Sequence, residues 1–153
     1  MPRVIFMCGP AGSGKSTVAR QLEADGITRL SFDQEAWNRG LRVMPLPDDA
    51  RADIDAHLRR RLIHLLEQGC DVVLDFSFWS RAMRDDWRGL VAPFGTAPET
   101  IYMATDRQTC LDRVRTRALD HGDDFALDPD IAASYFDHFQ PPTEDEGPLA
   151  VVR

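Results

Sequence analysis

The feature that most constrains this chain is an eight-residue run near its start, Gly-Pro-Ala-Gly-Ser-Gly-Lys-Ser at positions 9–16. The run fits the pattern G-x-x-x-x-G-K-[ST] at every fixed position. Apolar residues at 4–7 predict a strand before it, and the pattern at 15–25 predicts a helix after it. Glycines let a backbone come close to phosphate oxygens, and the amides and dipole at a helix start attract anions. We therefore predict a strand–loop–helix unit that binds nucleotide phosphates, in preference to a glycine-rich turn without a ligand.

The side chains of this loop suit a nucleotide that carries a metal ion. The Lys15 ammonium can reach the β- and γ-phosphates, and the Ser16 hydroxyl can bind Mg²⁺. We expect Ser16 and Thr17 to serve the metal and the region of the α-phosphate. With ATP and Mg²⁺ as the expected cofactors, the predicted nucleotide-binding residues are Gly9, Gly12, Ser13, Gly14, Lys15, Ser16 and Thr17.

Length and composition indicate one globular domain over residues 1–153. The net charge of −7 argues against broad electrostatic binding to long nucleic acids, although it is compatible with a local basic pocket. Cys8, Cys70 and Cys110 lie far apart without metal-ligand spacing, so we expect reduced, partly buried thiols in a cytoplasmic protein. The sequence shows no signal-peptide pattern and no apolar run near the ~20 residues of a membrane helix, and we expect no membrane association and no obligate protein partner.

Predicted strands alternate with predicted helices along the chain. The strands are expected at 4–7, 27–32, 71–75, 100–104 and 149–152. The helices are expected at 15–25, 34–38, 48–68, 81–91, 107–117 and 129–139. Such alternation with short connections predicts an α/β fold, a three-layer α/β/α sandwich with helices on both faces of a five-stranded parallel sheet. The order of the strands in the sheet does not follow from this alternation.

Asp33 follows the second predicted strand. In open α/β sheets ligands bind beyond the carboxyl ends of the strands, and a carboxylate there can accept the proton of a substrate hydroxyl. Asp33 can equally cap the short helix predicted at 34–38. The residues alone leave both interpretations open, and Asp33 is therefore a candidate catalytic base and substrate-binding residue.

Asp75 closes the apolar run of the third predicted strand. A carboxylate that ends a buried strand beside a phosphate loop can hold Mg²⁺ through water or orient a substrate. The alternative is that Asp75 caps the following loop. The aromatic run Phe76-Ser77-Phe78-Trp79 comes next, and it can either line an acceptor pocket or belong to the core, which is the default expectation.

Three arginines at helical spacing, Arg81, Arg84 and Arg88, follow this aromatic run. Guanidinium groups on one helix face can bind an anionic acceptor in a bidentate manner. They can also pair with Asp85 and Asp86 on a solvated face, which is the favoured interpretation for Arg88. Arg81 and Arg84 are therefore the candidate residues on the acceptor side.

The second basic segment is the helix predicted at 107–117. Arg113 and Arg117 are four residues apart and share one face of this helix. In phosphoryl transfer, arginines on a mobile helix and loop can close over the phosphates and stabilise charge in the transition state, and the alternative is a solvated surface face. An exposed loop is expected at 120–124 and suits the tip of a lid, which we place at about residues 106–127.

On these residues the chain resembles small bacterial P-loop kinases of the AAA type, which group with polynucleotide 5′-hydroxyl kinases, zeta-toxin-like kinases and chloramphenicol phosphotransferase. The loop at 9–16 is the motif of this superfamily. The run 75–81 is similar to the D-x-[GS]-F-W-S-R motif of these bacterial proteins, and Asp33 matches the catalytic base of the polynucleotide kinases and zeta toxins. The segment 139–147 is similar to the F-x-x-P-x-x-x-E-G-F ending of eukaryotic polynucleotide kinase domains, with Pro148 in place of its final Phe.

The resemblance implies a fold and a role for each candidate residue. The implied strand order is 2-3-1-4-5, with a lid that bears arginines. The implied catalytic residues are Asp33 as general base together with Lys15, Arg113 and Arg117. The implied acceptor-binding residues are Asp33, Arg81 and Arg84, and the implied metal-binding residues are Ser16 and Asp75. The segment 141–147 is the implied candidate for the adenine site.

The implied reaction is transfer of the γ-phosphoryl group of ATP to a hydroxyl. The acceptor is either a small molecule or the 5′-end of a polynucleotide, and the net charge and the C-terminal segment favour opposite choices. The alternative from a different class is a regulatory module that binds ATP or hydrolyses it slowly without a phosphoryl acceptor. Acceptor-dependent turnover of ATP distinguishes the enzyme from the module.

Overall fold

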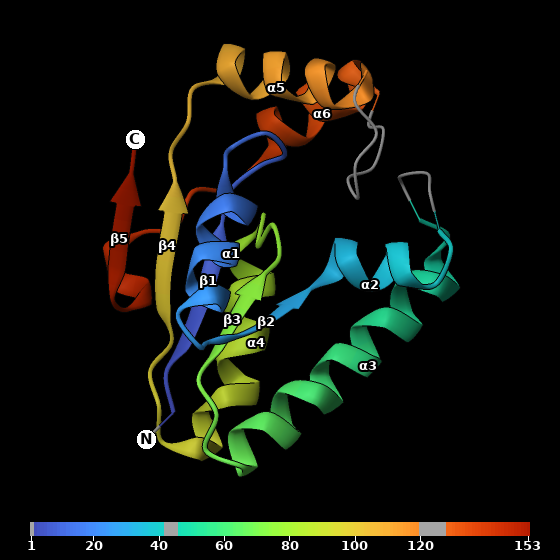
Figure 1. Cartoon of the computed structure of the whole chain (residues 1–153). Coiled ribbons are helices and arrows are strands. Elements are labelled where there is room, and N and C mark those ends of the chain that lie inside the picture. The colour runs from blue at the N-terminus through green and yellow to red at the C-terminus, as the bar shows by residue number, and fades with distance from the viewer. Residues whose placement is uncertain (1, 42–45, 120–127) are drawn as a thin grey trace.

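Five parallel strands form the centre of the protein, which is described by a computed structural model over residues 2–41, 46–119 and 128–153. The strands are β1 (Val4–Cys8), β2 (Thr28–Ser31), β3 (Val72–Asp75), β4 (Glu99–Met103) and β5 (Leu149–Val152). They are hydrogen-bonded in the order β2-β3-β1-β4-β5, and each neighbouring pair is parallel (Figure 1). The parallel sheet predicted from the alternation and the order implied by the resemblance are both confirmed.

Strand β1 lies at the centre of the sheet and sends alternate side chains into two cores. Val4, Phe6 and Cys8 belong to one core and Ile5 and Met7 to the other, and each is at most 1% exposed. Apolar side chains on both faces of a strand are expected where helices cover both faces of a sheet. The phosphate loop therefore leaves the sheet from a strand that is held on both sides.

Helix α1 (Lys15–Ala24) covers one face of the sheet. Ala19 is buried in the core that contains Ile5 and Met7, and Val18 and Leu22 pack against the same core. These three residues form the apolar face of the helix.

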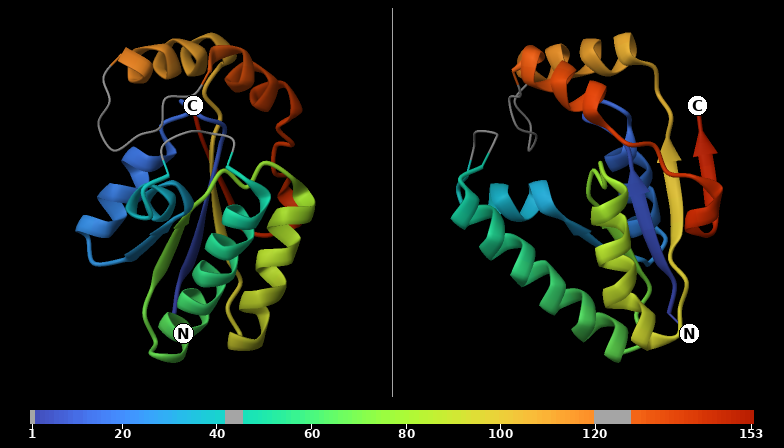
Figure 2. Two further views of the ribbon diagram at one scale, coloured as in Figure 1. Left: turned by 90° about the vertical axis from the view of Figure 1, so that its right-hand side faces the viewer. Right: turned by 180° about the vertical axis from the view of Figure 1, so that it is seen from behind.

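The opposite face is covered by α3 (Asp48–Glu67) and α4 (Arg81–Val91), as Figure 2 shows from two sides. The buried stripe of α3 consists of Ile54, Leu58, Leu62 and Leu66. Phe76, Phe78 and Trp87 pack with it, so the aromatic run after β3 is mainly core, as expected, and Trp79 remains half exposed. The three-layer α/β/α sandwich is confirmed.

Helices α4 and α6 begin at side chains that cap them. Ser80 accepts a hydrogen bond from the Met83 amide at the start of α4, and Asp128 accepts one from the Asp130 amide at the start of α6. The other helices are α2 (Phe32–Asn38), α5 (Arg107–Leu119), α6 (Pro129–His138) and the 3₁₀ turns Ala92–Phe94 and Glu144–Glu146.

Helices α5 and α6 lie together above the carboxyl edge of the sheet (Figure 1). Leu111 and Val114 of α5 pack against Ala132 of α6, and Ala11 of the phosphate loop joins this cluster. The lid expected at 106–127 thus coincides in part with α5, whereas residues 120–127, including the expected loop at 120–124, lie outside the described residues. Helix α6 packs on α5 although it lies beyond the expected lid.

The three cysteines are free thiols, of which Cys8 and Cys110 are buried and Cys70 is partly buried. Burial raises the pKa of the Cys8 thiol to about 12, so Cys8 remains protonated at neutral pH. No helix in the described part of the chain combines the length and the apolar character needed to cross a membrane.

Candidate nucleotide-binding site

The phosphate loop connects the end of β1 to the start of α1, and two of its glycines adopt positive φ angles. Gly14 is the N-cap of α1 with φ 93°, and Gly12 has φ 80°. A Cβ atom on Gly12 would lie 2.3 Å from the carbonyl oxygen of Cys110 in α5. Glycine is thus required at position 12 both by the backbone angle and by the close approach of α5.

The amides of the loop fall into two groups. The Gly9 amide donates to the Ser77 carbonyl at 3.1 Å, and the Ser13 amide donates to the Pro10 carbonyl at 3.1 Å. These two amides therefore maintain the shape of the loop. The first amides of a helix have no intrahelical acceptor, so the amides at the start of α1, from Lys15 to Thr17, are the ones available to an anion.

Lys15 and Ser16 are partly buried in the first turn of α1, and Thr17 is exposed. Among the described residues the Lys15 ammonium makes neither a hydrogen bond nor a salt bridge. A half-buried ammonium beside unpaired helix amides is suited to a phosphate group. The roles of these three residues in binding phosphate and Mg²⁺ stay predictions.

Asp75 lies at the end of β3, directly beside β1. The register pairs it with Met7 on one side and with Ser31 on the other. Its Oδ2 accepts hydrogen bonds from Nε and Nη2 of Arg29 at 3.0 and 2.7 Å. Its Oδ1 is buried and has no hydrogen-bond partner in the described part of the protein.

The Oδ1 atom of Asp75, which has no hydrogen-bond donor among the described residues, is a candidate ligand for the expected Mg²⁺. Magnesium sites commonly use one or two carboxylates and complete their coordination with water and substrate phosphates. The described residues contain no group of three or more His, Cys, Asp or Glu side chains that could hold a metal on their own. A buried carboxylate oxygen without a donor, together with the Ser16 hydroxyl on α1, fits a metal that arrives with a nucleotide.

Asp33 is the second residue of α2, immediately beyond the carboxyl end of β2. The cap of α2 is Ser31, whose hydroxyl accepts from the Gln34 amide at 3.1 Å. The interpretation of Asp33 as the helix cap is therefore wrong. The Asp33 side chain is exposed at the same edge of the sheet as Asp75, and its role as a general base stays a prediction.

The arginines of α4 are engaged with the C-terminal segment. Arg84 is 1% exposed and binds the Glu146 carboxylate at 2.7 Å and the carbonyls of Phe78 and Gln140. Its guanidinium is therefore closed to an acceptor, and we correct the prediction that Arg84 binds one. Arg81 is exposed and pairs with Asp145.

Glu146 was given no role by the residues alone, and it is central to this cluster. Burial opposes its charge, but hydrogen bonds from Arg84, from the Thr143 amide and from Arg88 lower its pKa to about 2. Arg88 also pairs with Asp85, as predicted. The pattern T-x-x-E at 143–146 forms a capping box and is the sequence signal from which the buried position of Glu146 could have been suspected.

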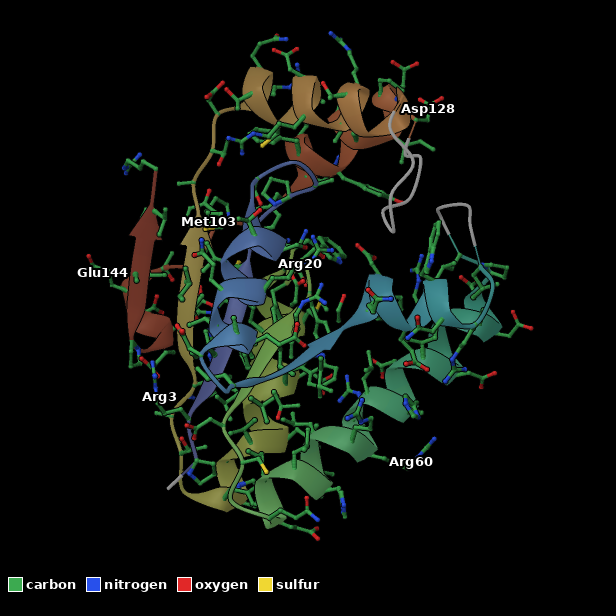
Figure 3. The ribbon with its side chains drawn as sticks, in the orientation of Figure 1. Arg3, Arg20, Arg60, Met103, Asp128 and Glu144 are labelled. Atoms are coloured by element: carbon green, nitrogen blue, oxygen red, sulfur yellow. The ribbon has the colours of Figure 1, made fainter. Side chains whose placement is uncertain are left out.

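A cavity of about 600 Å³ adjoins the phosphate loop. Its walls come from α1, from the end of β4 and from α5, with Thr17, Gln21, Met103, Asp106 and Arg113 among the lining residues. Figure 3 labels Met103 at the end of β4 beside α1. The segment 141–147 does not line this cavity, and its role as the adenine site stays a prediction.

Of the two predicted lid arginines, Arg113 contacts the phosphate loop. Nη1 of Arg113 donates to the Gly12 carbonyl at 3.1 Å, so this side chain extends from α5 to the phosphate loop. A second contact, from the Thr105 hydroxyl to the Ser13 carbonyl at 2.8 Å, joins the segment before α5 to the loop. Arg117 lies on α5, but its side chain is outside the described residues.

Comparisons with known proteins agree with this fold. The family model AAA_33, an AAA domain, matches residues 4–142. No curated protein sequence matches the chain. Among solved structures, the gluconokinase from Sinorhizobium meliloti 1021 is 22% identical with a TM-score of 0.64, and the match covers 99% of this chain and 82% of that one.

Two further structures are similar over most of this chain. Kti12 from Chaetomium thermophilum, solved with ADP-AlF3, is 17% identical with a TM-score of 0.71, and the match covers 97% of this chain and 88% of that one. A chain of the Pnkp1/Rnl/Hen1 RNA repair complex is 17% identical with a TM-score of 0.78, and the match covers 90% of this chain and 43% of that one. The match over residues 4–142 shows that this chain belongs to the AAA domain family, and its fold is that of the P-loop kinases.

Proposed function

We propose that the protein is an ATP- and Mg²⁺-dependent phosphotransferase that moves the γ-phosphoryl group to a hydroxyl. The observation that carries the proposal is one edge of the sheet that combines three features. These are the phosphate loop with the first amides of α1, the buried carboxylate oxygen of Asp75, and the exposed carboxylate of Asp33. A module that only bound ATP and Mg²⁺ would also use Asp75 for the metal, but it would have no use for a carboxylate on the acceptor side, which is the role we propose for Asp33.

The nucleotide is held by groups around the loop. The amides from Lys15 to Thr17 and the Lys15 ammonium bind the phosphates, and the base and ribose lie in the cavity of about 600 Å³, a size typical of ligand pockets. Arg113 binds the transferring group from the α5 side, and Arg117, whose side chain lies outside the described residues, is a second candidate for this role. Ser16 and Asp75 would hold Mg²⁺, which neutralises charge on the β- and γ-phosphates when it is bound.

Transfer itself requires a base on the acceptor side. Asp33 accepts the proton of the acceptor hydroxyl while the new O–P bond forms, and the bond from the γ-phosphorus to the bridging oxygen breaks to leave ADP. Arg81, which is exposed near the start of α4, remains a candidate for acceptor binding. The acceptor class is a small molecule or the 5′-hydroxyl end of a polynucleotide.

The test is transfer of label from γ-labelled ATP and Mg²⁺ to a panel of acceptors. The panel contains 5′-hydroxyl RNA and DNA oligonucleotides, nucleosides, sugars including gluconate, and aminoglycoside and phenicol antibiotics. Acceptor-dependent labelling is the expected result and identifies the acceptor class. Tight ATP binding with release of phosphate that no acceptor accelerates would instead support the regulatory module.

The role of Asp33 has its own test. Asp33→Asn is expected to lower the transfer rate by 10²–10⁴-fold and to leave the ATP dissociation constant within about twofold, because a general base acts only in the chemical step. Glu35→Gln is the matched control on α2, since Glu35 pairs with Arg39. Equal transfer rates in Asp33→Asn and the wild type would contradict the assignment.

A further inference from the structure

Arg29 and Asp75 form an ion pair between neighbouring strands. Their side chains are 8% and 0% exposed, and both Nε and Nη2 of Arg29 donate to the same carboxylate oxygen. The register places Arg29 opposite Val73, which belongs to the core under α1. Because side chains alternate along a strand, Asp75 lies on the same face as Val73.

This face is the one covered by α1, which carries Ser16. Met7, the partner of Asp75 in β1, also belongs to the core under α1. The pair therefore lies on the phosphate-loop side of the sheet and at its carboxyl edge.

The two oxygens of Asp75 are used unequally. Oδ2 receives two N–H groups from one planar guanidinium, whereas Oδ1 has no donor within the described residues. A buried acceptor without a partner is unfavourable, and such a group in a native protein requires an explanation, of which a bound ion is one. Two N–H groups from one plane fix the rotation of the carboxylate and so determine which oxygen remains available.

We propose that Arg29 is a positioning residue for Asp75. Arg29 holds Oδ2 of Asp75 in place, so that Oδ1 of Asp75 faces the Mg²⁺ of the bound nucleotide. The proposal rests on the proposed function, since it presumes an ATP·Mg²⁺ complex at the phosphate loop. Arg29 acts through Asp75 and does not itself contact the nucleotide.

The alternative is that Arg29 serves only to neutralise a buried carboxylate. The variant Arg29→Lys distinguishes the positioning role from charge neutralisation, because lysine keeps the positive charge but offers a compact ammonium in place of a planar pair of donors. If charge alone matters, the lysine variant should behave like the wild type. If orientation matters, it should bind the metal–nucleotide complex more weakly.

The experiment titrates the protein with a fluorescent ATP analogue, mant-ATP, once in EDTA and once in Mg²⁺. The dissociation constant in EDTA divided by the dissociation constant in Mg²⁺ is a ratio that measures how strongly the metal contributes to nucleotide binding. For Arg29→Lys we expect the ratio to fall about tenfold, within the range seen when partners of metal ligands are changed, with the constant in EDTA unchanged. Arg59→Lys is the matched control, because Arg59 is a partly buried arginine in ion pairs with Asp55 and Asp86.

A second set of variants tests whether Arg29 acts through Asp75. Asp75→Asn should lower the ratio, and Arg29→Met added to Asp75→Asn should lower it no further. The double variant removes both charges and so avoids an isolated buried ion, which protects the comparison from a failure to fold. A further fall in the double variant would mean that Arg29 contacts the nucleotide and would overturn its positioning role.

The possible failures are distinct. A wild-type protein that binds no mant-ATP in either buffer overturns the proposed function and this inference with it. A different outcome is that the wild type binds mant-ATP with a strong Mg²⁺ dependence while Arg29→Lys has the same ratio of dissociation constants as the wild type. That outcome overturns this inference and leaves the proposed function intact. A fall in the ratio for Arg29→Lys but not for Arg59→Lys supports it.

Discussion

Two buried ion pairs, on opposite faces of the sheet, differ in how completely their carboxylates are used. Glu146 accepts hydrogen bonds at both oxygens, Oε1 from Arg84 and Arg88 and Oε2 from the Thr143 amide. Asp75 accepts only at Oδ2, and its Oδ1 has no partner in the described ranges. The two side chains are 3% and 0% exposed, so solvent does not account for the difference.

The difference indicates separate roles. A carboxylate whose oxygens are all occupied has nothing left to offer a ligand, and Glu146 accordingly joins the C-terminal segment to Arg84 and Arg88 of α4. Arg84 in turn donates to the Phe78 carbonyl in the turn after β3. A carboxylate with one buried, unused oxygen beside a phosphate loop is incomplete without a ligand. We therefore assign the Arg84–Glu146 pair to the fold and the Arg29–Asp75 pair to the site.

The largest expected effect follows from Glu146→Gln. An amide must place its NH₂ group at one of the two oxygen positions, and both positions already face donors, so a buried donor–donor contact results whichever way it turns. We expect the free energy of unfolding to fall by about 3 kcal/mol, measured by urea denaturation. Glu144→Gln, on the same exposed turn, should change it by less than about 0.5 kcal/mol. Equal free energies of unfolding for Glu146→Gln and the wild type would contradict the assignment of the Arg84–Glu146 pair to the fold.

Replacing the Asp75 carboxylate by an amide, in Asp75→Asn, should have a small effect on stability and a large effect on phosphoryl transfer. Asn can accept from Arg29 and turn its NH₂ toward the side of Oδ1, where no donor is present, so we expect a stability loss below about 1.5 kcal/mol. Transfer from ATP should fall about 100-fold, equivalent to about 2.7 kcal/mol in the barrier. Asp71→Asn, just before the same strand, is the control and should transfer at the wild-type rate. A fast Asp75→Asn enzyme would contradict the assignment of this pair to the site.

The pH dependence of stability sharpens the comparison further. The pKa of Glu146 is lowered from 4.5 to about 2 in the folded protein, so its charge contributes stability that is fully present above pH 4.5 and is lost as the pH falls toward 2. The wild type should lose up to about 1.4 kcal/mol per pH unit more than Glu146→Gln across this window. The measurement is a series of urea denaturations from pH 5 to pH 2. Parallel curves for the two proteins would show that Glu146 is not responsible.

The smallest effect is expected for Arg81→Ala. Arg81 and Asp145 form an exposed pair, with 50% and 62% of the side chains accessible, and such pairs contribute about 0–1 kcal/mol. Stability should therefore change little, in contrast to the buried Arg84 one helical turn away. Steady-state kinetics give a second result, because a raised KM for the acceptor with unchanged ATP affinity would identify Arg81 as an acceptor-binding residue.

Much of the fold could be predicted because its signals are local. The phosphate-loop motif, the continuous apolar run at β3 and the caps Ser80 and Asp128 each depend on a few neighbouring residues. The strand order came from the resemblance, since pairing of distant strands has no signature within a single segment. The structure agrees with both.

The parts of the site that were wrong or missed depend on contacts distant in sequence. The position of Asp33 before the helix predicted at 34–38 makes it a candidate cap, but Ser31 two residues earlier takes that place. The helical spacing of Arg84 and Arg81 predicts that both lie on the acceptor side, but the partner of Arg84 is Glu146, 62 residues further along the chain. The pairing of Arg29 with Asp75 spans 46 residues and was likewise invisible in the sequence.

The measurement that tests the account most directly is thermal unfolding of the wild type, Glu146→Gln and Asp75→Asn, each with and without ATP and Mg²⁺. Ligand binding to the folded state raises the Tm, and about 1 kcal/mol corresponds to about 2–4 °C for a chain of this size. We predict that Glu146→Gln melts about 6–12 °C lower without ligand and keeps the full shift with ATP and Mg²⁺. Asp75→Asn should melt near the wild type and lose the Mg²⁺-dependent part of the shift. A loss of that part in Glu146→Gln, or its retention in Asp75→Asn, would contradict the division between the two pairs.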